Sequence, residues 1–395
     1  MNLQEQPGFA TVRRSIMLVG LFVLAMFAAQ TAQAQTFTIL HNFTGGADGD
    51  SPLAGLSMDR AGNLYGTTAY GGRQGGACTQ YSTCGTVFEL ERKNSGWIFR
   101  TLYEFSGPDG QTPEARVVIG PDGNLYGTTT AGGDAGQGTV FRLQPPPTVC
   151  KAVSCPWRET VLHSFQGGSD GANPAYGDLA FDQDGNIYGT TPNGGDNQSG
   201  TVFELSPSGS GWTETVIHVF NGSDGYEPYA GVIFDHAGNL YGTTSGGEGG
   251  DGNAFEMSHT ASGWSLSVIY NFAFPGGAYG GLILDAAGNL YGITAFDPTV
   301  YELSPSNGGW TYKALYTFDG YFSTAQLAMD ASGNLYGTIV LSNTEVFRLT
   351  PSDGQWTMTG FTGSAGAEPY GNVILDAGGN LYATASEDCV FAITP

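Results

Sequence analysis

Short runs of alternating or continuous apolar residues, separated by clusters of Gly, Pro, Asn and Asp, recur along most of the chain. The runs are rich in Tyr, Phe, Val and Thr, which is typical of β-strands that pack a buried face. In the first complete repeat, four such runs cover residues 53–58, 63–68, 86–90 and 97–105. The pattern therefore predicts one four-stranded unit per repeat.

The phrase Asp-x-x-Gly-Asn-Leu-Tyr-Gly-Thr-Thr marks each repeat and occurs in seven near copies. Successive copies lie 61, 62, 53, 50, 45 and 46 residues apart. Periods near 50 residues are typical of propellers and other repeat arrays. An all-β fold is predicted, a seven-bladed β-propeller of four-stranded blades. The copies place their asparagines at Asn63, Asn124, Asn186, Asn239, Asn289, Asn334 and Asn380.

The start of the phrase is expected to form a tight hairpin between the first two runs. In residues 59–63, aspartate can accept hydrogen bonds from backbone N–H groups ahead of it, and glycine supplies the positive φ of the turn. The recurring aspartate is therefore predicted to cap a turn.

The two ends of the propeller are predicted to complete one blade together. Residues 36–43 match the fourth run of other repeats, such as 213–220, yet precede the first complete repeat. The last repeat stops at a third run, residues 390–393. If the N-terminal strand closes the seventh blade, no sheet edge is left at the join.

Residues 1–34 have the features of a secretory signal peptide. Arg13 and Arg14 precede an apolar stretch over 16–29, and the Ala32-Gln33-Ala34 segment is a small-x-small cleavage site. The apolar stretch is shorter than the ~20 residues that a bilayer requires, which disfavours a membrane anchor. The expected mature chain is a single propeller domain, residues 35–395, without a membrane span, and either secreted, periplasmic or at the cell surface. The export route stays open.

The net charge is −23, and removing residues 1–34 makes it about −24. Such a surface repels phosphate backbones and anionic membranes, so no nucleic-acid partner is expected. A hydrophobic content of 40% with 12% aromatic residues favours a packed core over disorder. A monomer is expected.

Five cysteines fit an oxidising compartment. Cys78 and Cys84 flank one loop, and Cys150 and Cys155 flank another, which favours two local disulfides. No histidine lies near either pair, so a zinc site is not expected there. Cys389 falls in a strand-like run and is predicted to be a small buried residue.

The sequence contains no recognisable catalytic constellation. Three of the five histidines, His41, His163 and His218, share one place in the fourth run, where other repeats have tyrosine. A position that accepts either residue in successive blades is interpreted as a packing site, because copies one blade apart cannot converge on one metal. No catalytic residue, metal ligand or cofactor is predicted.

A second recurring motif lies between the repeats. Asp48, Asp109, Asp170 and Asp224 are each followed by glycine and lie four residues before a proline. The preferred interpretation is a turn that carries the chain from one blade's outer strand to the next blade's inner strand. Calcium is the alternative, since oxygen-rich turns in secreted repeats sometimes bind it.

Positions where the copies differ on the innermost strand are free to build one asymmetric site. Two rings, six and four residues before the hairpin turn, face the same way because they are two residues apart in a strand. At the channel mouth, tyrosines could stack on sugars and polar groups could orient hydroxyls. The alternative is that the tyrosines only plug the channel. The candidate ligand-binding residues are Glu114, Arg116, Tyr176, Asp178, Tyr229, Tyr279, Gln326, Tyr370 and Asn372.

The combined motif Gly-Asn-Leu-Tyr-Gly-Thr-Thr, then Gly-Gly, then Gly-Thr-Val-Phe-Glu-Leu at 200–205, resembles the Gloeo/Verruco-type tandem repeat of secreted bacterial proteins. The resemblance covers essentially the whole mature chain and implies an exported or surface protein. Members often carry a C-terminal sorting anchor, whereas this chain ends at Pro395 without an apolar tail, so release is expected. The family supplies no catalytic motif that could be assigned to residues of this chain.

Three classes of function remain. The preferred one is an exported, non-catalytic binding or adhesion module that takes a glycan or a protein at the channel mouth. The first alternative is a carbohydrate-active enzyme, a lyase or hydrolase, which needs two carboxylates across a cleft. Glu114 and Asp178 would be that pair, since they lie on the innermost strands of adjacent repeats. The second alternative is a structural envelope protein.

Overall fold

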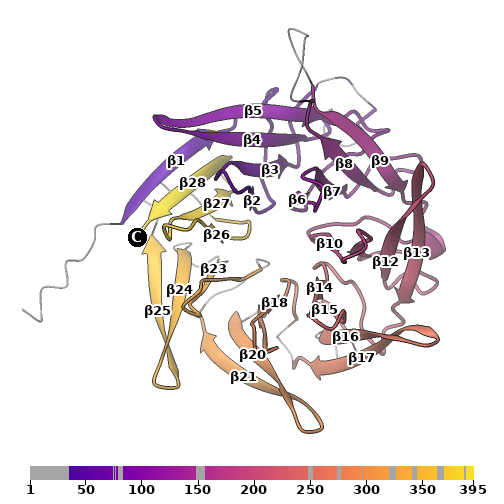
Figure 1. The fold of residues 1–395 in the computed structure, drawn as a ribbon, viewed down its shortest axis with the longest axis vertical. Coiled ribbons are helices and arrows are strands. Elements are labelled where there is room, and N and C mark those ends of the chain that lie inside the picture. The colour runs from indigo at the N-terminus through magenta and orange to yellow at the C-terminus, as the bar shows by residue number, and fades with distance from the viewer. Residues whose placement is uncertain are drawn as a thin grey trace, which may run out of the picture. The chain divides into compact units, whose positions relative to one another are not determined.

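Seven four-stranded antiparallel sheets follow one another around a ring (Figure 1). The computed structural model describes residues 35–73, 75, 77–78, 83–147, 156–247, 252–273, 277–295, 297–319, 326–339, 345–362, 369–386 and 388–395. Residues 37–394 make up the propeller. The seven-bladed all-β prediction is confirmed.

In blades 1 to 6 the strands run in chain order from the channel to the rim, and in blade 7 the N-terminal strand is outermost. Blades 1 to 3 comprise β2 Ser57–Met58, β3 Leu64–Thr68, β4 Thr86–Lys93, β5 Gly96–Glu104; β6 Val118–Ile119, β7 Leu125–Thr129, β8 Thr139–Gln144, β9 Arg158–Ser164; and β10 Ala180–Phe181, β11 Ile187–Thr191, β12 Thr201–Ser208, β13 Gly211–Val219. Blades 4 and 5 comprise β14 Ile233–Phe234, β15 Leu240–Thr243, β16 Asn253–Thr260, β17 Gly263–Asn271; and β18 Ile283–Leu284, β19 Leu290–Ile293, β20 Thr299–Ser306, β21 Gly309–Thr317. Blades 6 and 7 comprise β22 Ala328–Met329, β23 Leu335–Ile339, β24 Glu345–Ser352, β25 Gln355–Thr362; and β26 Ile374–Leu375, β27 Leu381–Ala385, β28 Cys389–Thr394, with β1 Thr36–Asn42 outermost.

The N-terminal strand closes the ring as predicted. The last sheet has the order β1-β28-β27-β26, and the indigo N-terminal strand lies beside the yellow C-terminal strands (Figure 1). Phe43 N donates to the Asp388 carbonyl at 2.7 Å, and Ser51 N donates to Asp388 Oδ1 at 2.7 Å. The rings of Phe37 and Phe391 stack at 5.0 Å. Backbone pairing and ring packing together therefore join the two ends of the propeller.

The aspartate of the repeated phrase caps its hairpin, as predicted. Asp59 Oδ1 accepts hydrogen bonds from the backbone N–H groups of Ala61 and Asn63, both at 2.8 Å. Its Oδ2 accepts from the Tyr65 hydroxyl at 3.3 Å, which anchors the tyrosine of the phrase. In blade 2 the equivalent residue is Gly120, and there Asp122, two residues later, takes over the cap.

The glycine of the phrase lies against the aromatic ring of the third strand. A Cβ atom on Gly66 would lie 2.5 Å from Phe88 Cζ, and one on Gly189 would lie 2.5 Å from Phe203 Cζ. Only glycine leaves room for these fully buried rings, which pack between neighbouring blades. The phrase therefore serves the core as well as the turn in blades 1 to 6, whereas in blade 7 Ala383 takes the place of the glycine opposite Phe391.

Threonine side chains join the blades near the channel. Thr67 Oγ1 donates to the Ala115 carbonyl of blade 2 at 3.1 Å, and Thr384 Oγ1 donates to the Ala54 carbonyl at 2.8 Å. The second bond links blade 7 to blade 1. Hydrogen bonds of the same kind link blades 3 to 4, 4 to 5 and 6 to 7.

The innermost strands are shorter than the sequence pattern predicts. The run 53–58 pairs only over Ser57–Met58, and each of the other innermost strands is also two residues long. An innermost strand has a partner on one side only, so its first residues leave the ladder and line the channel instead. Among the described residues, the structure contains no helix with the length and apolar character that a membrane crossing requires.

Candidate ligand-binding site

Four of the predicted residues form a polar collar around the channel, comprising Arg116, Asp178, Gln326 and Asn372. Arg116 and Asp178 link blades 2 and 3, with Nε of Arg116 at 3.0 Å from Asp178 Oδ2. Gln326 N donates to Asn372 Oδ1 at 2.6 Å, and Gln326 Nε2 donates to the Leu282 carbonyl at 2.8 Å, which links blades 7, 6 and 5. The collar side chains therefore bond mainly to neighbouring blades.

Glycines fill the collar positions of other blades because the backbones come too close for a side chain. A Cβ atom on Gly231 would lie 2.1 Å from the Asp178 carbonyl oxygen, and one on Gly55 would lie 2.9 Å from Asn372 Cβ. The variation around this ring is thus partly packing, in which a large side chain on one blade faces a glycine on the next. From the sequence alone, the same variation predicts positions that are free to bind a ligand.

Within the described part of the chain, one carboxylate oxygen of the collar has no hydrogen-bond partner. Asp178 Oδ2 accepts both hydrogen bonds from Arg116, whereas Asp178 Oδ1 is shielded from solvent and lacks a hydrogen-bond partner among the described residues. The Asp178 side chain is 17% exposed. A buried carboxylate oxygen without a donor is costly, so a bound hydroxyl or a water molecule could bond to this atom only after the Asp178 side chain shifts.

Three tyrosines of consecutive blades form an arc beside the collar. The rings of Tyr229 and Tyr279 stack, with centroids 5.5 Å apart and planes 15° apart, and Tyr176 lies 6.3 Å from Tyr229 at a tilt of 55°. Tyr176 is 40% exposed. We call Tyr176, Tyr229 and Tyr279 the tyrosine arc. Its rings offer flat apolar surface to a ligand.

Tyr176 is held in a left-handed conformation, with φ of 57°. That conformation is unfavourable for a bulky residue and concentrates at functional sites. At the same junction, the Oγ1 atom of Thr128 has no hydrogen-bond partner among the described residues, although Thr128 is only 2% exposed. Its counterparts in blades 1, 3, 4, 6 and 7 donate to the next blade. The contact between blades 2 and 3, which lies beside the tyrosine arc, thus lacks the threonine hydrogen bond that those other blades share.

Glu114 and Tyr370 line a small hollow that Tyr176 also lines. Thr130 Oγ1 donates to Glu114 Oε2 at 2.8 Å. Burial raises the pKa of the Glu114 carboxyl above its ordinary value, and the hydrogen bond from Thr130 opposes that shift. Burial, followed by the charge of Glu114, raises the pKa of Tyr370. A neutral Glu114 could donate as well as accept a hydrogen bond.

A cavity of about 250 Å³ brings most of the predicted residues together, since it is lined by Tyr176, Tyr279 and the whole collar. A small hollow of about 30 Å³ shares Tyr176 and Asp178 with it and adds Glu114 and Tyr370. Tyr229 lines neither space but stacks on Tyr279. Thr324, a member of the same ring of positions, lies outside the described residues.

Two wider cavities lie between neighbouring blades. One, of about 610 Å³, is lined by the hairpin turns of blades 3 and 4 with Trp264, and the other, of about 700 Å³, by those of blades 1 and 2 with Trp157. Their walls include the turn aspartates and tyrosines of the repeated phrase, such as Asp182 and Tyr188. The channel cavity instead gathers residues that differ between blades.

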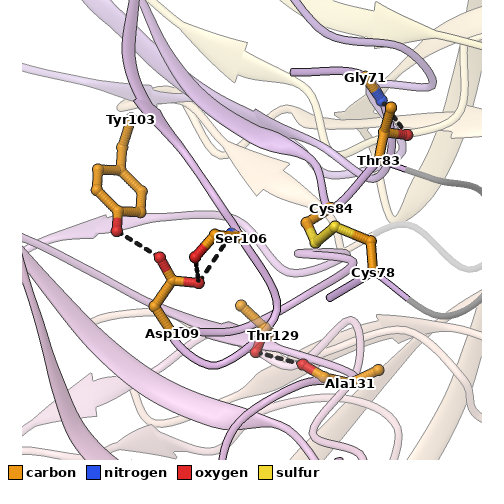
Figure 2. The surroundings of a disulfide bond; sticks show 9 residues. All are labelled: Gly71, Cys78, Thr83, Cys84, Tyr103, Ser106, Asp109, Thr129 and Ala131. Atoms are coloured by element: carbon orange, nitrogen blue, oxygen red, sulfur yellow. Dashed lines mark hydrogen bonds between the residues drawn. A yellow bond between two sulfur atoms is a disulfide. The ribbon is translucent and has the colours of Figure 1, made fainter. Parts of the chain in front are cut away.

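The Asp-Gly connections form turns, and they also bind the fourth strand. Asp109 Oδ1 accepts from Ser106 N at 2.8 Å, while Oδ2 accepts from the Tyr103 hydroxyl at 2.5 Å (Figure 2). His41, His163 and His218 contact Asp48, Asp170 and Asp224 in the same way, at 3.3, 3.1 and 3.1 Å. The packing interpretation of these histidines missed this bond. In the sequence, each of these His or Tyr residues lies six or seven positions before its aspartate, and this recurring spacing could have indicated the bond.

The predicted disulfide between Cys78 and Cys84 is present, with Cα atoms 5.5 Å apart (Figure 2). It closes the loop beside Thr83, whose hydroxyl accepts from Gly71 N. The predicted pair Cys150 and Cys155 lies outside the described residues. Cys389 is buried in β28, as expected for a small core residue.

Comparison with known proteins supports the fold. The family profile described as the Gloeobacter/Verrucomicrobia repeat matches residues 25–154 and 155–345. No curated protein matches the chain.

Several solved structures are similar in fold. A candidate 6-phosphogluconolactonase from Bacteroides uniformis has a TM-score of 0.52 at 16% identity, covering 78% of this chain and 83% of its own. The extracellular domain of a candidate hybrid two-component system from B. thetaiotaomicron has a TM-score of 0.53 at 13% identity, covering 91% of this chain and 41% of its own. A fungal alcohol oxidase in complex with copper has a TM-score of 0.56 at 13% identity, covering 91% and 76%. At these identities the similarity concerns the fold alone.

Proposed function

The chain belongs to the Gloeobacter/Verrucomicrobia repeat family, and on that premise we propose that it is an exported, non-catalytic binding module that holds a short glycan segment at the channel mouth. The observation that carries the proposal is the tyrosine arc beside the polar collar, around a cavity of about 250 Å³. That volume lies near the lower end for small-molecule pockets and suits one or two sugar rings.

The chemistry of the site fits sugars. Tyr176 and Tyr279 line the cavity and can stack on the C–H faces of a pyranose, while the side chains of Gln326 and Asn372 line the same cavity and can hydrogen-bond to sugar hydroxyls. Glu114 and Tyr370 supply further polar groups in the adjoining small hollow, which Tyr176 also lines. Stacking combined with hydrogen bonding would fix a ring's orientation.

The charge of the chain narrows the class of glycan. With a net charge of −23, the protein repels anionic polysaccharides at low ionic strength, so neutral sugars or amino sugars are the preferred ligands. The disulfide between Cys78 and Cys84 is typical of an oxidising compartment and supports export. Cleavage after Ala34 remains part of this proposal.

The bonds that the carboxyl groups of Asp178 and Glu114 make favour a binding role over the enzymatic alternative. Asp178 is ion-paired with Arg116, and Glu114 accepts a hydrogen bond from Thr130. A glycosidase pair needs one carboxylate that attacks or activates water and one acid that protonates the leaving group. The arginine bonded to Asp178 occupies this carboxylate and blocks its approach to a substrate.

The test is a binding screen of the mature protein against neutral, amino and acidic oligosaccharides, followed by calorimetric titration of the hits. We expect neutral or amino oligosaccharides to bind, and the titration to lose its signal when the tyrosine arc is altered. Binding confined to protein fragments would support the adhesion alternative instead. Release of reducing ends or unsaturated products during the titration would support the enzymatic alternative.

A further inference from the structure

The rim between blades 2 and 3 carries a polar cluster outside the channel site. His163 lies near the end of β9, Asp170 in the 3-10 turn η1 (Gly168–Asp170) that follows it, and Glu214 on β13. These two strands are the outer strands of neighbouring blades (Figure 1). One potential ligand atom from each residue lies within 4.8 Å of the other two, and within the described part of the chain it is the one such group of three.

The cluster is incomplete as a hydrogen-bond network. His163 Nε2 lies 3.1 Å from Asp170 Oδ1 and 3.3 Å from Oδ2, and Asp170 Oδ2 also accepts from Gln166 N at 2.6 Å. Glu214 Oε1, by contrast, is shielded from solvent and has no hydrogen-bond partner among the described residues. Two carboxyl groups therefore lie close together, and one of them has an oxygen to which no described residue donates a hydrogen bond.

The other blades show that a glutamate is not needed here for folding. Strand register places six residues at equivalent positions opposite the third strand, and four of them are apolar or aromatic: Phe99, Glu159, Glu214, Leu266, Tyr312 and Met358. Phe99 stacks on His41 with centroids 3.8 Å apart, and Tyr312 stacks on Tyr270 at 4.6 Å. A carboxyl group replaces this packing and brings a second acidic group toward Asp170, which is costly unless a bound cation or a proton neutralises the pair.

The donor set indicates which cation fits. We propose that His163, Asp170 and Glu214 bind one divalent transition-metal ion of the zinc or manganese class at the rim of blades 2 and 3. An imidazole nitrogen with two carboxylates suits these ions, whereas calcium takes six to eight oxygen ligands and magnesium prefers oxygen and water. Water would complete the coordination. The ion would join the outer strands of two blades, and in this way would stabilise the ring.

The junction of blades 1 and 2 provides an internal control. It has the same carboxylates, Asp109 and Glu159, but Tyr103 replaces the histidine, and its hydroxyl donates to Asp109. A neutral phenol donates a hydrogen bond where an imidazole would offer a lone pair, so this junction lacks the third ligand. The junction of blades 3 and 4 has His218 and Asp224 but Leu266 at the third place. One metal ion per chain is therefore expected.

The experiment is a calorimetric titration of tag-free mature protein, first stripped with a chelator, with ZnCl₂, MnCl₂ and CaCl₂ at pH 7.5. We expect one equivalent of Zn²⁺ or Mn²⁺ to bind with micromolar or tighter affinity, and the melting temperature to rise with metal concentration. Ca²⁺ should bind at least tenfold more weakly.

Two variants copy junctions that the chain already tolerates, which guards against misfolding. His163→Tyr reproduces the blade 1 to 2 junction, and Glu214→Leu reproduces the blade 3 to 4 junction. Each should weaken Zn²⁺ or Mn²⁺ binding at least tenfold, and Glu214→Leu should melt no lower than the metal-free parent. Glu159→Leu and His218→Tyr are the matched controls and should keep the parental affinity. The proposal is overturned if the parent binds neither ion stoichiometrically, if either test variant binds like the parent, or if a control loses affinity equally.

Discussion

Arg116 of blade 2 donates two hydrogen bonds to a single oxygen of Asp178 in blade 3, from Nε at 3.0 Å and from Nη2 at 2.5 Å. The two residues are 62 positions apart in the chain, and both side chains are largely buried at the channel. This geometry fixes the aspartate and leaves its other oxygen pointing away from the arginine. The pair therefore contributes both to the seam between two blades and to the proposed ligand site.

Removal of the arginine should destabilise the propeller. Arg116→Ala leaves Asp178 largely buried with no partner on either oxygen, and we expect a loss of about 2 kcal/mol in the free energy of unfolding. The double variant Arg116→Ala, Asp178→Ala should be more stable than Arg116→Ala alone, because it removes the unpaired charge. Urea unfolding followed by tryptophan fluorescence measures both. Equal stability of the parent and Arg116→Ala would contradict a stabilising role for the pair of Arg116 and Asp178.

Tyr229→Ala should abolish glycan binding while lowering the free energy of unfolding by less than about 1 kcal/mol, because a half-buried ring at a channel mouth packs loosely. Tyr316→Ala is the matched control, since Tyr316 is a half-buried tyrosine of β21 at the rim, and it should bind like the parent. If the tyrosines only plug the channel, Tyr229→Ala should instead cost roughly 2 to 4 kcal/mol and leave binding unaltered. Thermal unfolding and titration of the same samples distinguish the two results.

Tyr176→Gly should separate function from stability. Glycine adopts the φ of 57° found at Tyr176 without steric cost, so the variant should be as stable as the parent or more so. Tyr176→Ala keeps the backbone strain and should be about 1 kcal/mol less stable than Tyr176→Gly. Both variants lose the ring and should bind the ligand at least tenfold more weakly. A large loss of stability in Tyr176→Gly would show that the ring itself holds the seam.

Glu159 should make stability depend on pH. Burial and the nearby charge of Asp109 raise the pKa of Glu159 to about 7. Because the folded-state value lies above the ordinary one, the contribution of Glu159 is fully present below about pH 4.5 and is lost as the pH rises through 7. Partial exposure reduces the effect, so we expect a loss of about 1 to 2 kcal/mol across that range.

Urea titrations at several pH values check this expectation. Glu159→Gln removes the ionisable group, so the variant should be more stable than the parent at pH 8 and the difference should shrink or reverse at pH 5. The comparison isolates Glu159 from the other titrating groups of the chain. Parallel pH profiles for the two proteins would argue against a buried, protonated Glu159.

Deletion of residues 36–43 should prevent the ring from closing. Without β1, the backbone groups of β28 lose their partner and the apolar face that includes Phe391 is exposed, so the protein should aggregate or unfold. Addition of a synthetic peptide of residues 36–43 should restore part of the native circular dichroism. A deletion variant that melts like the full mature chain would refute closure by this strand.

The sequence by itself determined the architecture of this protein. The number of blades follows from the number of copies of the phrase, the closure from one spare and one missing strand, and the hairpin caps from the position of Asp59 and its equivalents. The disulfide between Cys78 and Cys84 also follows from local spacing. These features depend on residues close together in the chain or on the simple counting of copies, and both are visible in a linear pattern.

Only the tertiary structure decided how the variable residues meet. The pairing of Arg116 with Asp178, the fit of Gly231 against the Asp178 backbone, and the meeting of His163 with Glu214 all join residues of different blades. The angle and spacing between blades bring these positions into contact, and no single repeat encodes them. Equivalent positions in the seven repeats therefore look independent in the sequence, although packing around the ring couples each of them to its neighbour.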